Sequence, residues 1–212
     1  MIKDMRILVG GLVLAVAVLG AGGWWLSQDR NGDKFAQCRK SMVSGGMEAF
    51  GVPFTLTDQT GARVTDKQVF SKPGLLYFGY TYCPDVCPLD TSRNAAAVDI
   101  LKDQGMSVAP VMISIDPRRD TPEVLASFAE NIHPDMIGLT GTTEEIEAVS
   151  KGWRNMYKIE QPTGDDPDDY LVNHMTHTFL VLPETGTVEF FDREVTPEDM
   201  AARVGCFVEA AS

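Results

Sequence analysis

The chain has 212 residues, of which 44% are hydrophobic and 23% are charged. That balance suits one globular domain with room for a membrane anchor, and it requires no long disordered region. The formal net charge of -12 makes a nucleic-acid partner unexpected, because phosphate contacts need lysine and arginine. Otherwise the charge indicates only a well-solvated surface.

The N-terminus predicts a membrane anchor. Residues 7–26, ILVGGLVLAVAVLGAGGWWL, carry no charge and are about as long as a helix must be to cross a bilayer. Lys3 and Arg6 keep the short side in the cytoplasm, while Trp24 and Trp25 suit the far interface. A cleaved signal peptide is the alternative, but the apolar run is long for one. We therefore expect a single-pass inner-membrane anchor with the rest of the chain in the periplasm, or in the mitochondrial intermembrane space of a eukaryote.

Beyond the anchor, the sequence indicates a tether and one domain. The tether is polar and glycine-rich, which is typical of a linker. The expected parts are a cytoplasmic segment 1–6, the anchor 7–26, the tether 27–50 and a domain 51–212.

Hydrophobic periodicity and turn residues then predict the elements of the domain in chain order. They are a hairpin over 52–70 around DQTG, a buried strand 74–80, a helix 87–104, a buried strand 108–115, a helix starting at Asp120 or Thr121, a strand near 137–139, a helix opened by Thr142, a strand pair around Glu184 to Gly186, and a last helix capped by Thr196. The helix 87–104 is expected to bury Leu89, Ala96, Ile100 and Leu101.

This order predicts the fold class. Strands that alternate with helices imply parallel crossovers, and a closing antiparallel hairpin makes the sheet mixed. We expect an α/β protein with a thioredoxin-like mixed sheet flanked by helices. In this arrangement, the chain's two neighbouring cysteines, Cys83 and Cys87, lie between the first core strand and the helix that follows it.

These two cysteines belong to the motif YTYCPDVCP, residues 80–88. Cys83 and Cys87 are four residues apart, so both sulfurs can point from one face of a helix start. The helix N-terminus stabilises thiolates, the form that attacks disulfides and binds metal. The spacing alone leaves three possibilities open: a redox-active pair, a soft metal site that suits Cu(I), or a structural disulfide.

Three histidines are candidates for a third metal ligand. His133 ends a helix before Pro134, which favours a surface or capping role. His174 and His177 come just before the strand that starts near Thr178. In a thioredoxin-like sheet this strand runs beside the strand that leads to the cysteines, so we expect the preceding loop to face the motif.

Three segments in this order carry a family resemblance: YFGYTYCPDVCPLD, VMISIDPRRDTPEVL and DYLVNHMTHTFLVLPETG. Together they resemble the Sco/SenC family of membrane-anchored copper chaperones for the CuA site of cytochrome c oxidase, over about residues 50–208. The resemblance implies a thioredoxin-like fold. It also implies one copper ion, Cu(I) or Cu(II), held by the two motif cysteines and one distal histidine.

Carried onto this sequence, the implied copper ligands are Cys83, Cys87 and His174. The stretch 170–174 matches the family pattern before the histidine, and an aromatic strand follows. Asn173 replaces the usual aspartate, so we expect altered contacts around the histidine ring. His177 is the less suitable neighbour, and a role as a back-up ligand stays open.

The resemblance also points to residues around the ligands. Asp116 is a candidate for orienting them, with a turn-forming role before Pro117 as the alternative. Asp85 is expected to be exposed, where its negative charge can help to steer a partner protein toward the motif. Cys38 and Cys206 lie outside the copper motif. Since an exported domain keeps disulfides, we expect a bridge between these two, with two free thiols as the alternative.

The implied function is copper delivery. The protein would receive copper from an upstream donor, after a thiol reductant has reduced the cysteine pair, and pass it to the CuA subunit of cytochrome c oxidase. The alternative is a membrane-anchored thiol-disulfide oxidoreductase, which needs only the cysteine pair. Thioredoxin-type enzymes place a cis-proline opposite their cysteines, and the residues 175–178 contain no proline, which argues against this enzyme.

Overall fold

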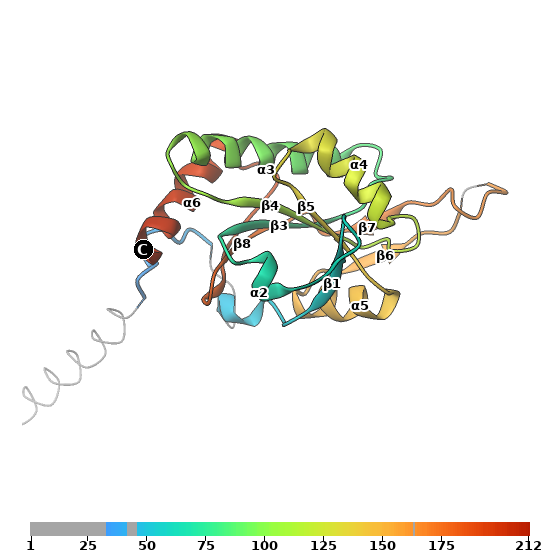
Figure 1. The fold of residues 1–212 in the computed structure, drawn as a ribbon, viewed down its shortest axis with the longest axis horizontal. Helices are drawn as coiled ribbons and strands as arrows, with labels where there is room; N and C mark the ends of the chain where they lie inside the picture. The colour runs from blue at the N-terminus through green and yellow to red at the C-terminus, as the bar shows by residue number, and fades with distance from the viewer. Residues whose placement is uncertain (1–32, 42–45, 163) are drawn as a thin grey trace, which may run out of the picture. The chain divides into compact units, whose positions relative to one another are not determined.

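The computed structural model describes residues 33–41, 46–162 and 164–212. Within them, the part of the chain from residue 38 onward contains a seven-stranded sheet in the order β2-β1-β5-β4-β3-β8-β9 (Figure 1). The strands are Thr55–Asp58 (β1), Arg63–Thr65 (β2), Gly74–Gly79 (β3), Ala109–Ser114 (β4), Ile137–Thr140 (β5), Thr178–Leu182 (β8) and Gly186–Phe191 (β9). The helices are Asp66–Val69 (α2), Val86–Asp103 (α3), Pro122–Ile132 (α4), Thr143–Gly152 (α5) and Pro197–Ala211 (α6), with a 3-10 turn at Met47–Ala49.

The buried strand β3 lies next to the central strand β4 of the sheet, between β4 and β8. It pairs in parallel with β4 and antiparallel with β8. Every residue of these three strands is apolar or glycine except Tyr77, Ser114 and Thr178, which carry hydroxyl groups. Helices α3, α4 and α6 lie on one face of the sheet, and α2 and α5 lie on the other (Figure 1). The expected mixed α/β sheet flanked by helices is confirmed. So is the expectation that the strand after the histidines runs beside the strand leading to the cysteines.

Threonine caps fix where most helices begin. The side chains of Thr121, Thr142 and Thr196 each accept a hydrogen bond from the backbone N–H three residues on, as the sequence predicts. The predicted hairpin over 52–70 was too long, because Thr65 and Gln68 form a capping box that starts α2 at its end.

The expected apolar side of α3 was largely wrong. Leu89 is 59% exposed, whereas Asp90, Thr91 and Asn94 are buried against the sheet. Leu101 is the one residue of the expected set that is fully buried. This helix therefore buries polar groups near its start, and those groups need partners.

Two short strands escaped the sequence analysis. Tyr157–Ile159 (β6) and Val172–His174 (β7) form a separate antiparallel pair. Each strand has three residues and includes exposed polar ones, so neither shows a clear alternating pattern. The pairing matters because it places His174 at the end of a strand.

The domain begins with a covalently fixed segment. The expected disulfide between Cys38 and Cys206 is present, with the two Cα atoms 5.6 Å apart. Next to it, the backbone N–H groups of Lys40 and Ser41 donate to the buried carboxylate of Glu189, at 2.9 and 3.3 Å. Part of the expected tether is thus attached to β9 and α6.

Across residues 33–41, 46–162 and 164–212, no helix has the length and apolar character needed to cross a membrane. The predicted anchor at residues 7–26 lies outside the described part of the chain, as does the cytoplasmic segment 1–6.

Candidate metal centre

The cysteine motif lies where three central elements meet. Strand β3 ends at Gly79, and α3 starts at Val86, so the loop that holds Cys83 connects them. Because β8 is antiparallel to β3, the residues before β8 lie at the same end of the sheet. Gly79 is needed there, since a Cβ atom on it would lie 2.7 Å from the Tyr77 ring and 3.2 Å from the Cys87 sulfur.

Cys83 takes the position of a helix cap. Asp85 occupies the N-cap of α3 but makes no capping hydrogen bond with its side chain. Instead, the Sγ atom of Cys83 accepts from the backbone N–H of Cys87 at 3.3 Å. The positive end of the helix dipole therefore faces this sulfur, which favours its thiolate form.

The two sulfurs differ in protonation. A hydrogen bond from the Cys87 thiol is the largest contribution that lowers the pKa of Cys83, to about 3, against the opposing effect of burial. A hydrogen bond from the backbone of Asp85 acts in the same direction. The pKa of Cys87 is raised, first because its proton is held by Cys83 and second because it is buried. The pair thus holds one negative charge on Cys83.

His174 presents one ring nitrogen to the sulfurs. Its Nε2 atom lies 3.4 Å from the Sγ atom of Cys87, and its Nδ1 atom lies 2.8 Å from the carbonyl oxygen of Met175. A carbonyl only accepts hydrogen bonds, so Nδ1 carries the proton and Nε2 keeps its lone pair. The rings of Tyr77 and Tyr80 pack edge-on against the imidazole, with centroids 6.0 and 5.9 Å away. This tautomer and orientation suit a metal ligand.

Cys83, Cys87 and His174 together form a cluster that could hold one metal ion. Their ligand atoms all lie within 4.8 Å of one another. With metal–ligand bonds of roughly 2.0–2.3 Å, two ligands on one ion are at most about 4.6 Å apart, so little movement is required. Two cysteine sulfurs with one imidazole are a donor set that suits copper.

The structure separates the other histidines from this cluster. The Nε2 atom of His177 lies 3.1 Å from an Asp192 carboxylate oxygen, and its ring packs on Phe190. His133 is the C-cap of α4, as expected for a capping role, but it is buried rather than on the surface. It contacts Asp99 at 3.2 Å.

The Asn173 side chain is directed away from the histidine ring, so the contact that orients the ring comes from another residue. The side-chain amide of Asn173 donates to Glu160 at 2.9 Å and points to solvent. Neighbouring residues on a strand face opposite sides, so residue 173 points away from the side that carries His174. The Met175 carbonyl does the orienting instead, a contact that the sequence pattern does not reveal.

Asp116 lies outside the cluster and acts on the chain that leads to His174. The carboxylate is fully buried, forms an ion pair with Arg119, and accepts a hydrogen bond from the Tyr170 hydroxyl at 2.7 Å. Arg119 in turn donates to the Tyr170 carbonyl at 2.9 Å and stacks 3.6 Å from the centre of its ring. The Tyr80 hydroxyl then accepts from the backbone of Val172 at 3.2 Å.

Asp120 is a positioning residue that the sequence analysis treated only as a possible helix cap. It is fully buried and accepts hydrogen bonds from the Thr81 backbone N–H at 3.0 Å and from the Thr81 hydroxyl at 2.6 Å. The Ser114 hydroxyl donates to it as well. Asp120 thus fixes the loop just before Cys83. Asp85, by contrast, is exposed as expected.

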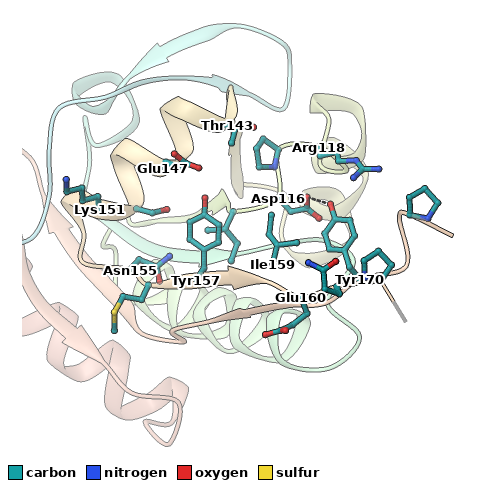
Figure 2. Close-up of a pocket in the computed structure, with 17 residues that line it drawn as sticks. Asp116, Arg118, Thr143, Glu147, Lys151, Asn155, Tyr157, Ile159, Glu160 and Tyr170 are labelled. Atoms are coloured by element: carbon teal, nitrogen blue, oxygen red, sulfur yellow. Dashed lines mark hydrogen bonds between the residues drawn. The ribbon is translucent and has the colours of Figure 1, made fainter. Parts of the chain in front are cut away.

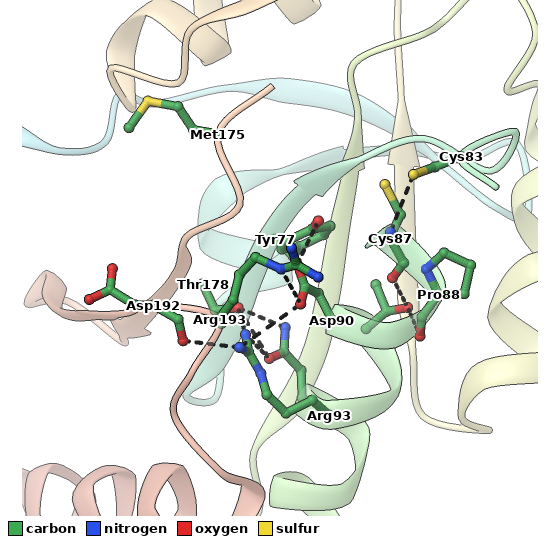
Figure 3. A network of polar contacts seen from close by, with 12 residues as sticks. Tyr77, Cys83, Cys87, Pro88, Asp90, Arg93, Met175, Thr178, Asp192 and Arg193 are labelled. Carbon is green, nitrogen blue, oxygen red and sulfur yellow. Dashed lines mark hydrogen bonds and ion pairs between the residues drawn. The ribbon is translucent and has the colours of Figure 1, made fainter. Parts of the chain in front are cut away.

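A buried polar network lies behind Cys87 (Figure 3). The Tyr77 hydroxyl donates to Asp90 at 3.1 Å, and the Arg193 guanidinium donates to the same carboxylate at 3.3 Å. Arg93 and Asn94 continue the network to the Thr178 hydroxyl at 3.0 and 2.9 Å. These contacts explain the polar buried face of α3 and join it to β3 and β8.

The fold and the cluster define a thioredoxin-like protein with a Cys-Cys-His site suited to a soft metal. A family model described as SCO1/SenC matches residues 43–209. The chain therefore belongs to the SCO1/SenC family of copper chaperones.

Individual relatives agree with this assignment. Protein SenC of Rhodobacter capsulatus is 53% identical over 178 residues, covering 84% of this chain and 79% of that protein. Protein SCO1 homolog 1, mitochondrial, of Arabidopsis thaliana is 42% identical, covering 73% of this chain, and the human protein SCO1 homolog, mitochondrial, is 36% identical, covering 75%. The chain spans only 46% and 53% of these two longer proteins.

Solved structures show the same fold. Arabidopsis thaliana ScoI with copper bound superposes with a TM-score of 0.70 at 38% identity, covering 76% of this chain and 99% of that one. Bradyrhizobium japonicum ScoI with copper bound gives 0.66 at 35% identity, covering 74% and 98%.

Proposed function

We propose that this protein is a copper metallochaperone, which holds one copper ion through Cys83, Cys87 and His174 and delivers it to the CuA site of cytochrome c oxidase. The observation that supports this most strongly is the convergence of the two sulfurs and the Nε2 atom within 4.8 Å in a chain of the SCO1/SenC family. Copper is the cargo in this proposal.

The chemistry of the cluster suits reversible binding. Three protein ligands leave room for an incoming thiolate, so the ion can pass to an acceptor by ligand exchange. The Cys83 thiolate binds without first losing a proton, whereas Cys87 must release one. Both sulfurs must be reduced, because a disulfide offers no thiolate, and both cysteines are free thiols in the structure.

Copper titration of the reduced protein tests the ligand set. We expect the wild type to bind one copper ion per chain, with a thiolate-to-Cu(II) charge-transfer band after Cu(II) loading. His174→Ala should remove the band and weaken binding, because the third ligand is lost. His177→Ala is the matched control and should bind like the wild type, since its ring pairs with Asp192.

Two results would contradict the proposal. In the first, neither histidine matters and the protein binds copper no better than a simple dithiol. In the second, His177→Ala is as damaging as His174→Ala, which would reject this ligand set.

A second candidate function is thiol-disulfide exchange, and the low pKa of Cys83 favours it. The Cys83 thiolate would attack an acceptor disulfide, and Cys87 would then displace the acceptor thiol, leaving Cys83–Cys87 oxidised and the acceptor reduced. Reduction of a disulfide substrate that is unaffected by His174→Ala would support this function, whereas copper binding that depends on His174 supports the chaperone.

We further propose that residues 7–26 anchor the protein in the inner membrane, with the copper domain facing the periplasm or the intermembrane space. The uncharged run and its flanking Lys3 and Arg6 support this topology. A copper donor, a thiol reductant and the CuA subunit are the expected partners. Deleting residues 1–26 should release the protein from membranes into the soluble fraction, and retention after deletion would reject the anchor.

A further inference from the structure

A groove of about 940 Å³ lies between α5 and β6, away from the copper ligands (Figure 2). Glu147 and Lys151 line it from α5, with the Lys151 side chain pointing outward at one end, and Tyr157 and Ile159 point toward α5 from β6 (Figure 2). Ile159 is 49% exposed and the adjacent Met156 is 74% exposed. The groove therefore has a solvent-exposed apolar wall next to the charged side chains of α5.

Two buried polar groups line this groove without a hydrogen-bond partner in the described part of the chain. They are the Oγ atom of Ser150 and the Nδ2 atom of Asn155, on residues that are 2% and 5% exposed. Unsatisfied buried donors are costly. Both atoms have almost no exposed surface, so a ligand carbonyl accepts from them only after the side chains rotate toward the groove. A peptide backbone carries such a carbonyl at every residue.

Strand β6 has a free edge among the described strands. Its partner is β7, and the sheet that they form has two strands. The Glu160 N–H donates to Leu171, and the Met156 carbonyl accepts from Met175. Since antiparallel pairing alternates along a strand, the N–H and C=O groups of Tyr157 and Ile159 point away from β7. Such an edge is a template for an added strand.

Charge indicates the kind of occupant. The loop 164–169 has the sequence GDDPDD, and Pro167 within it lines the groove. Glu147, Glu160 and Lys151 line it too. Glu160 pairs with Lys158 and Arg118 pairs with Asp168, so the excess negative charge comes mainly from the aspartates of the loop. A second copy of this acidic chain, with a net charge of -12, would be repelled. A basic segment is attracted.

We propose that the groove binds an extended, basic segment of a partner protein. The segment adds to the free edge of β6 as a strand, and its alternate apolar side chains enter the space between α5 and β6. A strand added there shares the sheet face of Tyr157 and Ile159, so every second side chain faces the groove.

The groove shares a wall with the support of the copper site. Asp116 and Tyr170 line it, and the hydrogen bond between them holds the chain that leads to His174 (Figure 2). A partner bound here is therefore held beside the exchange site. This consequence rests on the proposed copper function, but peptide binding does not, so tests on reduced, metal-free protein separate the two.

The probe is a capped eight-residue peptide with valine at every second position and lysine at both ends, titrated into the full chain while backbone amide NMR shifts are followed. We expect shifts at Tyr157 and Ile159. Two twin peptides are the controls: one has glutamate in place of lysine, and one carries N-methyl groups on the amides that would pair with β6. Each twin should bind about tenfold more weakly or worse, a difference of about 1.4 kcal/mol.

Protein variants locate the binding site. Glu147→Trp fills the groove from the exposed surface of α5 and should weaken binding of the lysine peptide about tenfold or more. Ala148→Trp, at the next exposed position and outside the groove lining, should bind like the wild type. Glu147→Gln removes the charge alone and should have a smaller effect. Amide shifts like those of the wild type outside the groove show that Glu147→Trp is folded.

Three outcomes would overturn the proposal. If Glu147→Trp binds the lysine peptide as tightly as the wild type, the peptide binds outside the groove. Equal binding of the N-methylated twin rejects strand addition. In the third outcome, the lysine peptide does not bind, whereas an apolar dye binds to the wild type and not to Glu147→Trp. That result assigns the groove to a small apolar ligand instead of a protein segment.

Discussion

Cys83 and Cys87 are four residues apart, yet their sulfurs lie in opposite electrostatic settings. Cys83 accepts hydrogen bonds at the start of α3, and Cys87 donates its proton to Cys83. A metal ion that arrives therefore meets one thiolate already formed. The Nε2 atom of His174 lies beside the pair, 3.4 Å from the Cys87 sulfur.

Titration of the thiolate absorbance in the reduced, metal-free protein tests this asymmetry. We expect one thiolate to persist at about pH 5, far below the ordinary thiol pKa of about 8.5, because the pKa of Cys83 is lowered to about 3. Cys83→Ser should abolish this low-pH thiolate. Cys87→Ala should raise the pKa of Cys83, since the largest stabilising hydrogen bond is removed. A thiolate that is lost near pH 8 in the wild type would contradict the assignment.

At the scale of single residues, the sequence indicates the same three side chains that the structure brings together. The spacing of Cys83 and Cys87 and the strand after the histidines indicate the cysteine pair and the loop that faces it, whereas the choice of His174 over His177 rests on the family resemblance. The hydrogen bonds that hold these three side chains in place could not be predicted, because they join residues far apart in the chain. Asp120 reaches Thr81 across 39 positions, and Tyr170 reaches Asp116 across 54.

At the scale of elements, α3 shows how site requirements override periodicity. A helix of ordinary amphipathic pattern buries its apolar residues, but here Leu89 faces solvent and Asp90 faces the sheet. Asp90 is buried because Tyr77 from β3 and two arginines surround it. The strands β3 and β4 were predictable because they are short, fully buried apolar runs, whereas β6 and β7 carry no such signal.

Replacing Asp90 tests the energetic weight of this network. Asp90→Ala should lower the free energy of unfolding by about 3 kcal/mol, because it leaves a buried guanidinium with fewer partners. The side chain of that residue, Arg93, is 10% exposed. Urea denaturation of the reduced protein measures the change. Asp103→Ala, at the exposed end of α3, is the control and should stay within about 0.5 kcal/mol of the wild type. Equal stabilities for the two variants would show that the network is dispensable.

At the scale of the whole domain, Glu189 joins the first described residues to the sheet and to α6. Its carboxylate is fully buried and accepts from Lys40, Ser41 and Arg203. Burial alone would raise the pKa of Glu189, but these hydrogen bonds outweigh it and hold the pKa below its ordinary value. The ionised form is thus favoured by the folded state.

The stability of the domain should therefore depend on pH through Glu189. A glutamate with a lowered folded pKa stabilises the protein above its unfolded pKa, near 4.5, and this contribution is lost as pH falls toward the folded pKa. We expect the free energy of unfolding to fall more steeply below about pH 5 in the wild type than in Glu189→Gln. The other carboxylates titrate in both proteins, so their contributions cancel when the two pH profiles are subtracted. Parallel curves in acid would reject the role of Glu189.

The disulfide between Cys38 and Cys206 acts on the same junction through the unfolded chain. It links positions 168 residues apart, and closing so long a loop restricts the unfolded ensemble by up to about 5 kcal/mol. The double variant Cys38→Ser with Cys206→Ser should lose stability of that order in urea denaturation. Its copper stoichiometry should not change, because neither residue belongs to the Cys-Cys-His cluster.

The single variants separate a covalent effect from a packing effect. Each of Cys38→Ser and Cys206→Ser breaks the bridge, so each should lose nearly as much stability as the double variant. If the losses of the two single variants instead add up to that of the double variant, the serines disturb packing and the bridge itself contributes little.

Because Glu189 holds Lys40 and Ser41 beside Cys38, combining Glu189→Gln with the double variant should also reveal coupling. A segment released from the bridge gains more freedom when its second attachment is weakened, so the combined loss should exceed the sum of the separate losses.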